Sequence, residues 1–115
     1  EMAKLGVRLG ANPNTFFGLA GVGDLVATCF SVHGRNLRIG RALGEGKKLK
    51  EILSGMEAVA EGIDSSESVH QLCQKVDLHL PIMGEVYQIL FHEKDPRQAV
   101  LDLLRRGAHE EWKQY

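Results

Sequence analysis

The chain has 115 residues, 43% of them hydrophobic and 25% charged, and its formal net charge at pH 7 is −1. This length and composition are typical of one globular domain with a single core, and they exclude an intrinsically disordered chain. The nearly balanced charge excludes a general attraction to nucleic acid or to an anionic membrane, so any anion site must be local.

The N-terminal quarter reads as short helices separated by glycine and proline. Residues 1 to about 10 are predicted to form a helix that ends at Gly10, a residue type favoured just past a helix C-terminus. Asn12-Pro13 marks a new start, because proline is tolerated in a first helical turn. We expect this short helix to break near Gly21. Gly23-Asp24 then begins another helix, whose apolar side consists of Leu25, Val26 and Cys29.

The middle of the chain is less regular. Gly34-Arg35-Asn36 leads into a helix with apolar positions at Leu37, Ile39 and Leu43. Residues 44–48, with the sequence GEGKK, read as a turn, and a brief helical face follows at Leu49, Ile52 and Leu53. Residues 56–62 fit a helix, a strand or an extended loop, so their structure is left open.

The C-terminal half carries clearer helix signals. Asp64-Ser65-Ser66-Glu67 resembles a capping box, which predicts a helix start there. A helical stripe follows at Val69, Leu72, Cys73 and Val76. Pro81 starts the next helix, with a buried face formed by Ile82, Val86, Ile89 and Leu90. Asp95-Pro96 caps the last helix, which packs through Ala99, Val100, Leu103 and Leu104 and stops before Gly107. The predicted fold is a single all-α domain over residues 1–115.

Three features of the sequence concern membrane insertion, cellular location and whether the chain is part of a longer polypeptide. No apolar run approaches the ~18–20 residues that span a bilayer, so we expect no membrane insertion. Cys29 and Cys73 lie far apart, in apolar surroundings and without a CxxC pattern, which favours buried, reduced thiols in a cytoplasmic protein over a disulfide. Residues 1–10 read as the latter part of a helix, so we expect the chain to be a piece of a longer polypeptide.

The segment from Phe16 to Arg41 is the candidate binding site. Its glycines are Gly18, Gly21, Gly23, Gly34 and Gly40. Glycine at this density weakens a helix, which indicates a turn, a close backbone approach or a ligand. The polar side chains of the segment suit a small polyol that carries a phosphate, because carboxylates and amides bind hydroxyls and a guanidinium matches phosphate oxygens. These side chains belong to Asp24, Thr28, Ser31, Arg35 and Asn36.

Each of these features also has a structural explanation. Asp24 is more often a helix N-cap than a ligand. Arg35 equally fits a solvated basic face that it shares with Arg38 and Arg41. Glu57 and Glu61 lie four residues apart but are better explained as solvated acids. The histidines show no metal-ligand spacing, and we expect no metal site.

The sequence GLAGVGDLVATCFS, followed by HGRN and later by VAEG, resembles the C-terminal domain of bacterial-type NAD(P)-dependent glycerol-3-phosphate dehydrogenases. The resemblance covers nearly the whole chain. It implies a compact helical domain of the kind found at the C-terminus of 6-phosphogluconate dehydrogenase. It also implies a preceding Rossmann domain that binds NAD or NADP. The enzyme family interconverts sn-glycerol 3-phosphate and dihydroxyacetone phosphate, and it supplies glycerol 3-phosphate for phospholipid synthesis.

The resemblance also implies roles for individual residues. Substrate would be bound by Asp24, Thr28, Gly34, Arg35 and Asn36. The dinucleotide would be touched by Arg35, Val59 and Glu61. Gly34 is a departure, because the family usually has serine there, so the phosphate would rely on backbone N–H groups, on Ser31 or on water. No catalytic lysine lies in a matching context, and we expect the isolated chain to be inactive. The alternative hypothesis is a non-catalytic helical module that associates, for instance as a homodimer.

Overall fold

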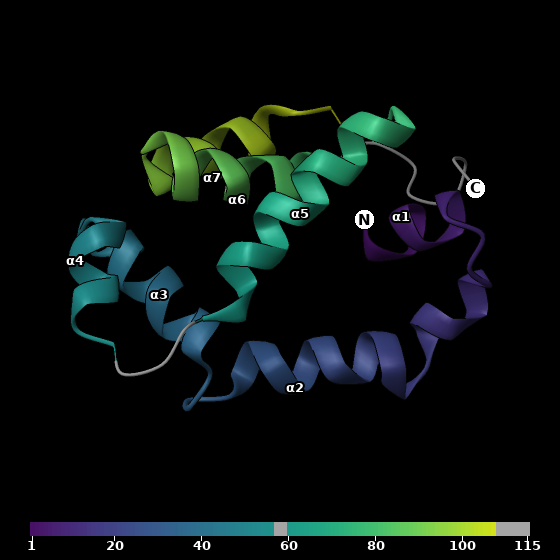
Figure 1. Cartoon of the computed structure of the whole chain (residues 1–115), viewed down its shortest axis with the longest axis horizontal. Helices are drawn as coiled ribbons and strands as arrows, with labels where there is room; N and C mark the ends of the chain where they lie inside the picture. The colour runs from purple at the N-terminus through teal and green to yellow at the C-terminus, as the bar shows by residue number, and fades with distance from the viewer. Residues whose placement is uncertain (57–59, 108–115) are drawn as a thin grey trace.

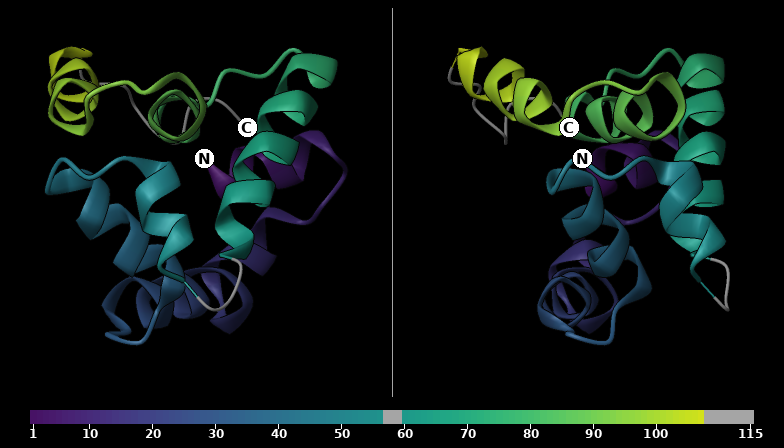
Figure 2. Two further views of the ribbon diagram at one scale, coloured as in Figure 1. Left: turned by 60° about the vertical axis from the view of Figure 1, so that its left-hand side comes forward. Right: turned by 90° about the vertical axis from the view of Figure 1, so that its left-hand side faces the viewer.

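The computed structural model describes residues 1–56 and 60–107. Every regular element within these two ranges is helical, which confirms the all-α prediction. Figure 1 shows α2 along one edge, α6 and α7 at the opposite edge, and the long helix α5 between them. The helices α3 and α4 lie at one end and α1 at the other, and the turned views of Figure 2 keep α2 apart from α6 and α7.

The N-terminal helices begin and end where local chemistry predicts. Helix α1 (Met2–Arg8) is followed by Gly10, which has a φ of +90° that glycine adopts readily. The 3-10 helix η1 (Pro13–Phe17) starts at Asn12, whose side-chain oxygen accepts a hydrogen bond of 2.9 Å from the Asn14 N–H. Both predicted boundaries are confirmed.

The predicted break at Gly21 is wrong. The π-helix η2 (Leu19–Gly23) continues directly into α2 (Asp24–Phe30), and the interruption falls at the extended Gly18 instead. Gly21 is buried, and a Cβ atom there would collide with the Phe16 backbone. The Phe16 ring in turn occupies the space that a Cβ of Gly6 would need. Phe16 therefore lies between two glycines and joins α1, η1 and η2 by close approach.

Helices α3 (Arg35–Gly44) and α4 (Leu49–Ser54) agree with prediction. Ile39 of α3 is 4% exposed, and Leu37 and Leu43 are half-buried. The predicted turn at 44–48 contains Gly46 at a φ of +90°, and α4 follows it.

Helix α5 (Glu61–Val76) starts earlier than predicted. The apparent capping box at 64–67 lies inside the helix, because α5 begins at Glu61 after the fully buried Ala60. Ser66 instead donates a hydrogen bond of 2.7 Å to the Gly62 carbonyl one turn earlier. The predicted stripe is half-buried at all its positions, which are Val69, Leu72, Cys73 and Val76.

Two side chains of the N-terminal segment bind the ends of later helices. The Glu1 carboxylate accepts hydrogen bonds of 2.7 and 2.9 Å from the N–H groups of Ile82 and Met83 in the first turn of α6 (Pro81–His92). Arg8 donates two hydrogen bonds, of 3.1 and 2.9 Å, to the Val76 carbonyl at the end of α5. A carboxylate at a helix N-terminus and a guanidinium at a C-terminus both complement the helix dipole. These contacts hold α1 against the α5–α6 junction.

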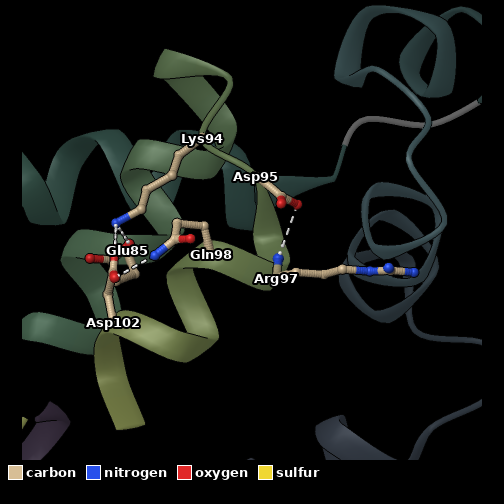
Figure 3. Close-up of polar contacts among 6 residues, drawn as sticks. All are labelled: Glu85, Lys94, Asp95, Arg97, Gln98 and Asp102. Carbon is tan, nitrogen blue, oxygen red and sulfur yellow. Dashed lines mark hydrogen bonds and ion pairs between the residues drawn. The ribbon is translucent and has the colours of Figure 1, made fainter. Parts of the chain in front are cut away.

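The last helix, α7 (Pro96–Arg105), begins at the predicted cap, where Asp95 accepts a hydrogen bond of 3.1 Å from the Arg97 N–H. Figure 3 shows this cap and the cluster beside it. Lys94 Nζ lies 2.6 Å from Glu85 Oε2 and 2.8 Å from Asp102 Oδ2, so it links α6 to α7. The Lys94 bond lowers the pKa of the Asp102 carboxyl, and the Asp102 and Glu85 bonds raise the pKa of Lys94.

We expect Lys94→Met to lower the free energy of unfolding near neutral pH. We also expect this free energy to fall less in the variant than in the parent chain when the pH is lowered. Because the folded pKa of Asp102 is depressed, its stabilising contribution is present above its unfolded pKa of about 3.9 and is lost as the pH falls through the folded value. Urea unfolding at about pH 7 and about pH 3 measures the effect. Lys47→Met is the control, since Lys47 pairs with Glu45 at an exposed position. An equal loss in both variants would contradict the prediction.

The buried apolar core of the described residues is small. It consists of Ile39, Ala60, Leu80 and Ala99. The faces predicted to pack on α6 and α7 are partly exposed. The predicted burial is wrong for Ile82, Val86, Val100 and Leu104, whereas Ile89, Leu90 and Leu103 are half-buried and Ala99 is buried. The predicted apolar side of α2 is also exposed at Leu25 and Val26. Leu19 of η2 is 90% exposed and Phe30 of α2 is 80% exposed, so the η2–α2 segment has exposed apolar side chains. The sequence pattern correctly identified apolar faces, but the described residues, 1–56 and 60–107, leave these parts of them exposed.

Candidate functional site

Helix α2 carries the first part of the candidate site. Asp24 and Thr28 are four residues apart in one helix, so their side chains share a face, and both are exposed. The interpretation of Asp24 as an N-cap is wrong. The chain is already helical at Gly23, and no side-chain hydrogen bond caps α2. The Asp24 carboxylate therefore has no capping role in the fold and is exposed where it can accept from a ligand hydroxyl.

A tight turn connects Thr28 to the Arg-Asn pair. The Ser31 N–H donates to the Thr28 carbonyl at 3.3 Å, and the Gly34 N–H donates to the Ser31 carbonyl at 2.9 Å. A Cβ at Gly34 would lie 3.0 Å from the Ser31 oxygen and 3.7 Å from the Thr28 oxygen. The turn thus places Gly34, as the residue before α3, against the end of α2.

The first turn of α3 presents Arg35 and Asn36, both exposed. No side chain caps this helix, so its first N–H groups remain available to an anion. Within residues 1–56 and 60–107, the ion pairs of the structure lie elsewhere and engage neither Asp24 nor Arg35. The carboxylate and the guanidinium are therefore both free of intramolecular partners in the described part of the chain.

Asn36 also connects α3 to α5. A Cβ built on Gly62 would lie 2.6 to 2.7 Å from the side-chain atoms of Asn36, so the amide rests directly on the bare Gly62 backbone. Gly62 is the second residue of α5, and Asn36 is the second residue of α3. The N-terminal ends of two helices, each with a positive dipole end, therefore meet at this contact (Figure 1).

The structure brings some of the predicted site residues together. Gly34 lies against the Thr28 carbonyl, and Asn36 lies against the first turn of α5, which Glu61 begins. Glu61 is exposed there. No hydrogen bond within the described chain links Asp24 to Arg35 or Asn36, and Val59 lies outside the described residues. Whether these residues bind substrate or dinucleotide stays a prediction.

Sequence reasoning missed Gly62 as part of this site. The available signal was the glycine that follows Glu61 in VAEG, because glycine in a first helical turn often marks a close approach. A groove of about 350 Å³ includes Asn36 and Gly62 in its lining and runs between α3, α5 and α6. Apart from Asn36 and Ser66, the residues that line this groove are mainly apolar and include Ile39, Leu43, Ile63 and Ile89.

Three other sequence expectations can be compared with the structure. Both cysteines are free, as predicted, but Cys29 is exposed and Cys73 half-buried, so the predicted burial of Cys29 is wrong. Burial raises the pKa of the Cys73 thiol, and the nearby Glu1 carboxylate adds to the increase. Across the described ranges, no three His, Cys, Asp or Glu side chains gather as a metal site would require. None of the described helices has the length and apolarity to cross a bilayer.

The described residues form a helical fold in which the N-terminal ends of α3 and α5 meet beside exposed polar side chains. The chain belongs to the family described as NAD-dependent glycerol-3-phosphate dehydrogenase C-terminus, which matches residues 1–101. It is 50% identical over 111 residues to the glycerol-3-phosphate dehydrogenase [NAD(P)+] of Geobacillus kaustophilus, covering 96% of this chain and 32% of that protein. It is 44% identical over 112 residues to the enzyme of the same name from Lacticaseibacillus casei, covering 97% of this chain and 32% of that protein.

A solved structure supports the same assignment. The crystal structure of glycerol-3-phosphate dehydrogenase from Coxiella burnetii superposes with a TM-score of 0.87 at 42% identity, over 91% of this chain and 32% of that chain. The chain spans about a third of the length of the curated relatives it matches. The resemblance read from the sequence motifs is therefore confirmed at the level of family and fold.

Proposed function

We propose that this chain is the substrate-binding helical part of an NAD(P)-dependent glycerol-3-phosphate dehydrogenase. The enzyme would interconvert sn-glycerol 3-phosphate and dihydroxyacetone phosphate. The observation that carries the proposal is the meeting of the α3 and α5 N-termini at Asn36 and Gly62, with Arg35 beside it, in a chain of this family. The uncapped N-terminus of α3, which has no acidic residue in its first turn, and the Arg35 guanidinium together favour a phosphate, whereas the first turn of α5 carries Glu61 and Asp64.

The phosphate end of the substrate would bind at this junction. The Arg35 guanidinium can donate hydrogen bonds to two phosphate oxygens. The Asn36 amide and the uncapped N–H groups of α3 supply further donors. Gly34 has no hydroxyl, so the backbone N–H groups and Ser31 take over the role of the serine that is usual in the family. The absence of a side chain at Gly34 also leaves the backbone open to the anion.

The polyol end would reach α2. Asp24 is exposed and makes no cap, and its carboxylate can accept hydrogen bonds from the substrate hydroxyls. Thr28, one turn later, adds a hydroxyl on the same face. These groups would bind and orient the central carbon. The proton on its oxygen would be handled by a lysine outside this chain, and we assign no catalytic residue here.

The dinucleotide would be held mainly by a Rossmann domain that precedes this chain in the whole protein. When bound, NAD or NADP accepts or returns the hydride of the reaction. Arg35 and Glu61 are exposed on the first turns of α3 and α5, close to the Asn36–Gly62 contact, so they fit a cofactor that approaches the same junction. Val59 is proposed as a third contact.

The cellular setting is also part of the proposal. The whole protein would act in the cytoplasm and supply glycerol 3-phosphate for phospholipid synthesis. Its uncovered apolar helix faces would be covered by the rest of the polypeptide or by a second subunit in a homodimer.

A hybrid enzyme tests the proposal. In this hybrid, the chain replaces the corresponding segment of the Geobacillus kaustophilus relative, with which it shares 50% identity. We expect the purified hybrid to oxidise NADH or NADPH with dihydroxyacetone phosphate, and the isolated chain to show no turnover. A folded hybrid without turnover would contradict the proposal, with the unaltered Geobacillus enzyme as the positive control.

A second candidate function, association without catalysis, is favoured by the apolar side of η2 and α2. Leu19, Val22, Leu25, Val26 and Phe30 are all exposed there. Exposed apolar surface of this kind is typical of interaction sites. Sedimentation of the isolated chain tests this function, since a monomer at high concentration would exclude self-association. A dimer that persists in an inactive hybrid would favour it.

A further inference from the structure

Gly62 provides the surface on which the Asn36 side chain rests. The three Asn36 atoms nearest to a Cβ built on Gly62 are Oδ1, Cγ and Nδ2, at 2.6, 2.7 and 2.7 Å. The whole amide group therefore occupies the space that a methyl group would fill. A real Cβ cannot come that close, so any side chain at residue 62 must displace the amide or move the helix.

The backbone of Gly62 does not itself require glycine. Gly62 lies within α5, and it is not among the glycines that have a positive φ. In such a position alanine is the better helix former. Helix formation alone therefore gives no reason for glycine here, whereas the space taken by Asn36 does.

The rest of the first turn of α5 fixes where Gly62 lies. Ala60, immediately before the helix, is fully buried, and the Ile63 N–H donates to its carbonyl at 3.1 Å. The Gly62 carbonyl accepts the Ser66 hydroxyl at 2.7 Å. The surface under Asn36 is thus backbone that is anchored on both sides, and it cannot easily retreat from an added methyl group.

We propose that Gly62 is a positioning residue for Asn36: its missing side chain lets the amide lie where it can reach the substrate phosphate. This inference rests on the proposed function, in which Asn36 binds that phosphate. Gly62 makes no contact with substrate in this scheme and acts only through Asn36. An added methyl group at residue 62 would turn the amide away and weaken substrate binding without altering the reacting atoms.

The test uses the hybrid enzyme with Gly62→Ala. We expect the KM for dihydroxyacetone phosphate to rise roughly 10-fold, as for the loss of one hydrogen bond to a charged group, with kcat nearly unchanged. The matched control is Gly44→Ala on α3, where an added Cβ meets no atom within 4 Å. We expect the control to keep the parent KM. An unchanged KM in Gly62→Ala would overturn the inference.

A double-mutant cycle separates positioning from general disturbance. Asn36→Ala alone should raise KM, and adding Gly62→Ala should then change it little, because the displaced group is already gone. Additive effects would overturn the inference. Hybrids labelled with 15N-asparagine give a readout that does not need turnover. The Asn36 side-chain amide signal should shift in Gly62→Ala and stay in place in Gly44→Ala.

The outcomes for the two proposals are distinct. A parent hybrid without turnover contradicts the proposed function, and the amide signal still shows whether Gly62 positions Asn36. An active parent hybrid in which Gly62→Ala changes neither KM nor the amide signal contradicts only the role of Gly62.

Discussion

Replacing Arg35 with alanine in the hybrid enzyme is expected to raise the KM for glycerol 3-phosphate by about 10- to 100-fold. A charge-assisted hydrogen bond contributes roughly 1.5–3 kcal/mol, and a guanidinium can bind a phosphate through two of its donors at once. Arg35 is exposed on the first turn of α3 and has no ion pair among the described residues that would compete with the ligand. Steady-state kinetics over a range of substrate concentrations measures the change.

The control for Arg35 is a basic residue of the same helix. Arg41→Ala removes an equal charge from the last turn of α3, away from the junction with α5. We expect its KM to stay within about 2-fold of the parent value, since an exposed charge at that distance is screened by salt. Equal increases in both variants would favour the solvated basic face over a phosphate site. Arg35→Lys should recover only part of the affinity, because an ammonium lacks the planar fork.

Gly21→Ala should lower the free energy of unfolding by about 2–3 kcal/mol, the upper part of the range for forced overpacking. Gly21 is buried, and its missing Cβ leaves room for the backbone of Phe16. Backbone cannot turn aside as a flexible side chain can, so η2 has to separate from η1. Urea unfolding of the isolated chain measures the loss, and the hybrid should also lose affinity because Asp24 follows η2 directly.

A helical glycine with open space around it is the matched control. Gly84 lies within α6, and a Cβ there would meet no atom within 4 Å. Gly84→Ala should leave stability unchanged or increase it by up to about 1 kcal/mol, the difference in helix propensity. If Gly21→Ala were equally harmless, the close approach of Phe16 to Gly21 would be contradicted.

The sequence predicted the helix boundaries that depend on neighbouring residues. Asn12 and Asp95 cap their helices through N–H groups two residues later, and Gly10 and Gly46 adopt the positive φ that turns require. These interactions are complete within a few residues, so composition and spacing reveal them. Proline at the first position of η1, α6 and α7 acts in the same local way.

The errors arose where packing, and not the chemistry of the residues themselves, decides the structure. Gly21 was read as a helix breaker, but its role is to admit Phe16. The acid and serines at 64–67 have capping chemistry, yet α5 already begins at Glu61, next to the buried Ala60. The apolar faces of α2, α6 and α7 were recognised, but their burial was overestimated, because a periodic pattern does not show what packs against a face.

In the candidate site, too, some residues could be predicted from the sequence, whereas one contact is shown only by the structure. The motif identified Asp24, Thr28, Arg35 and Asn36 as candidates because their chemistry suits a polyol phosphate. Only the folded chain shows that Asn36 rests on Gly62, since the two residues belong to helices that are separated by α4. Their contact comes from tertiary packing, which no local pattern encodes.

Helix α2 is a direct continuation of η2, whereas Arg35 and Asn36 begin a separate helix that packs with α4 and α7. The residues proposed to bind the two ends of the substrate therefore belong to different helices of the fold. We expect changes along η2 and α2 to move Asp24 more than Arg35 and Asn36, because α2 reaches α3 through the turn that ends at Gly34. Selectivity for the length of the polyol can then diverge independently of phosphate affinity, and an engineer seeking a longer substrate would begin with α2 and leave α3 unchanged.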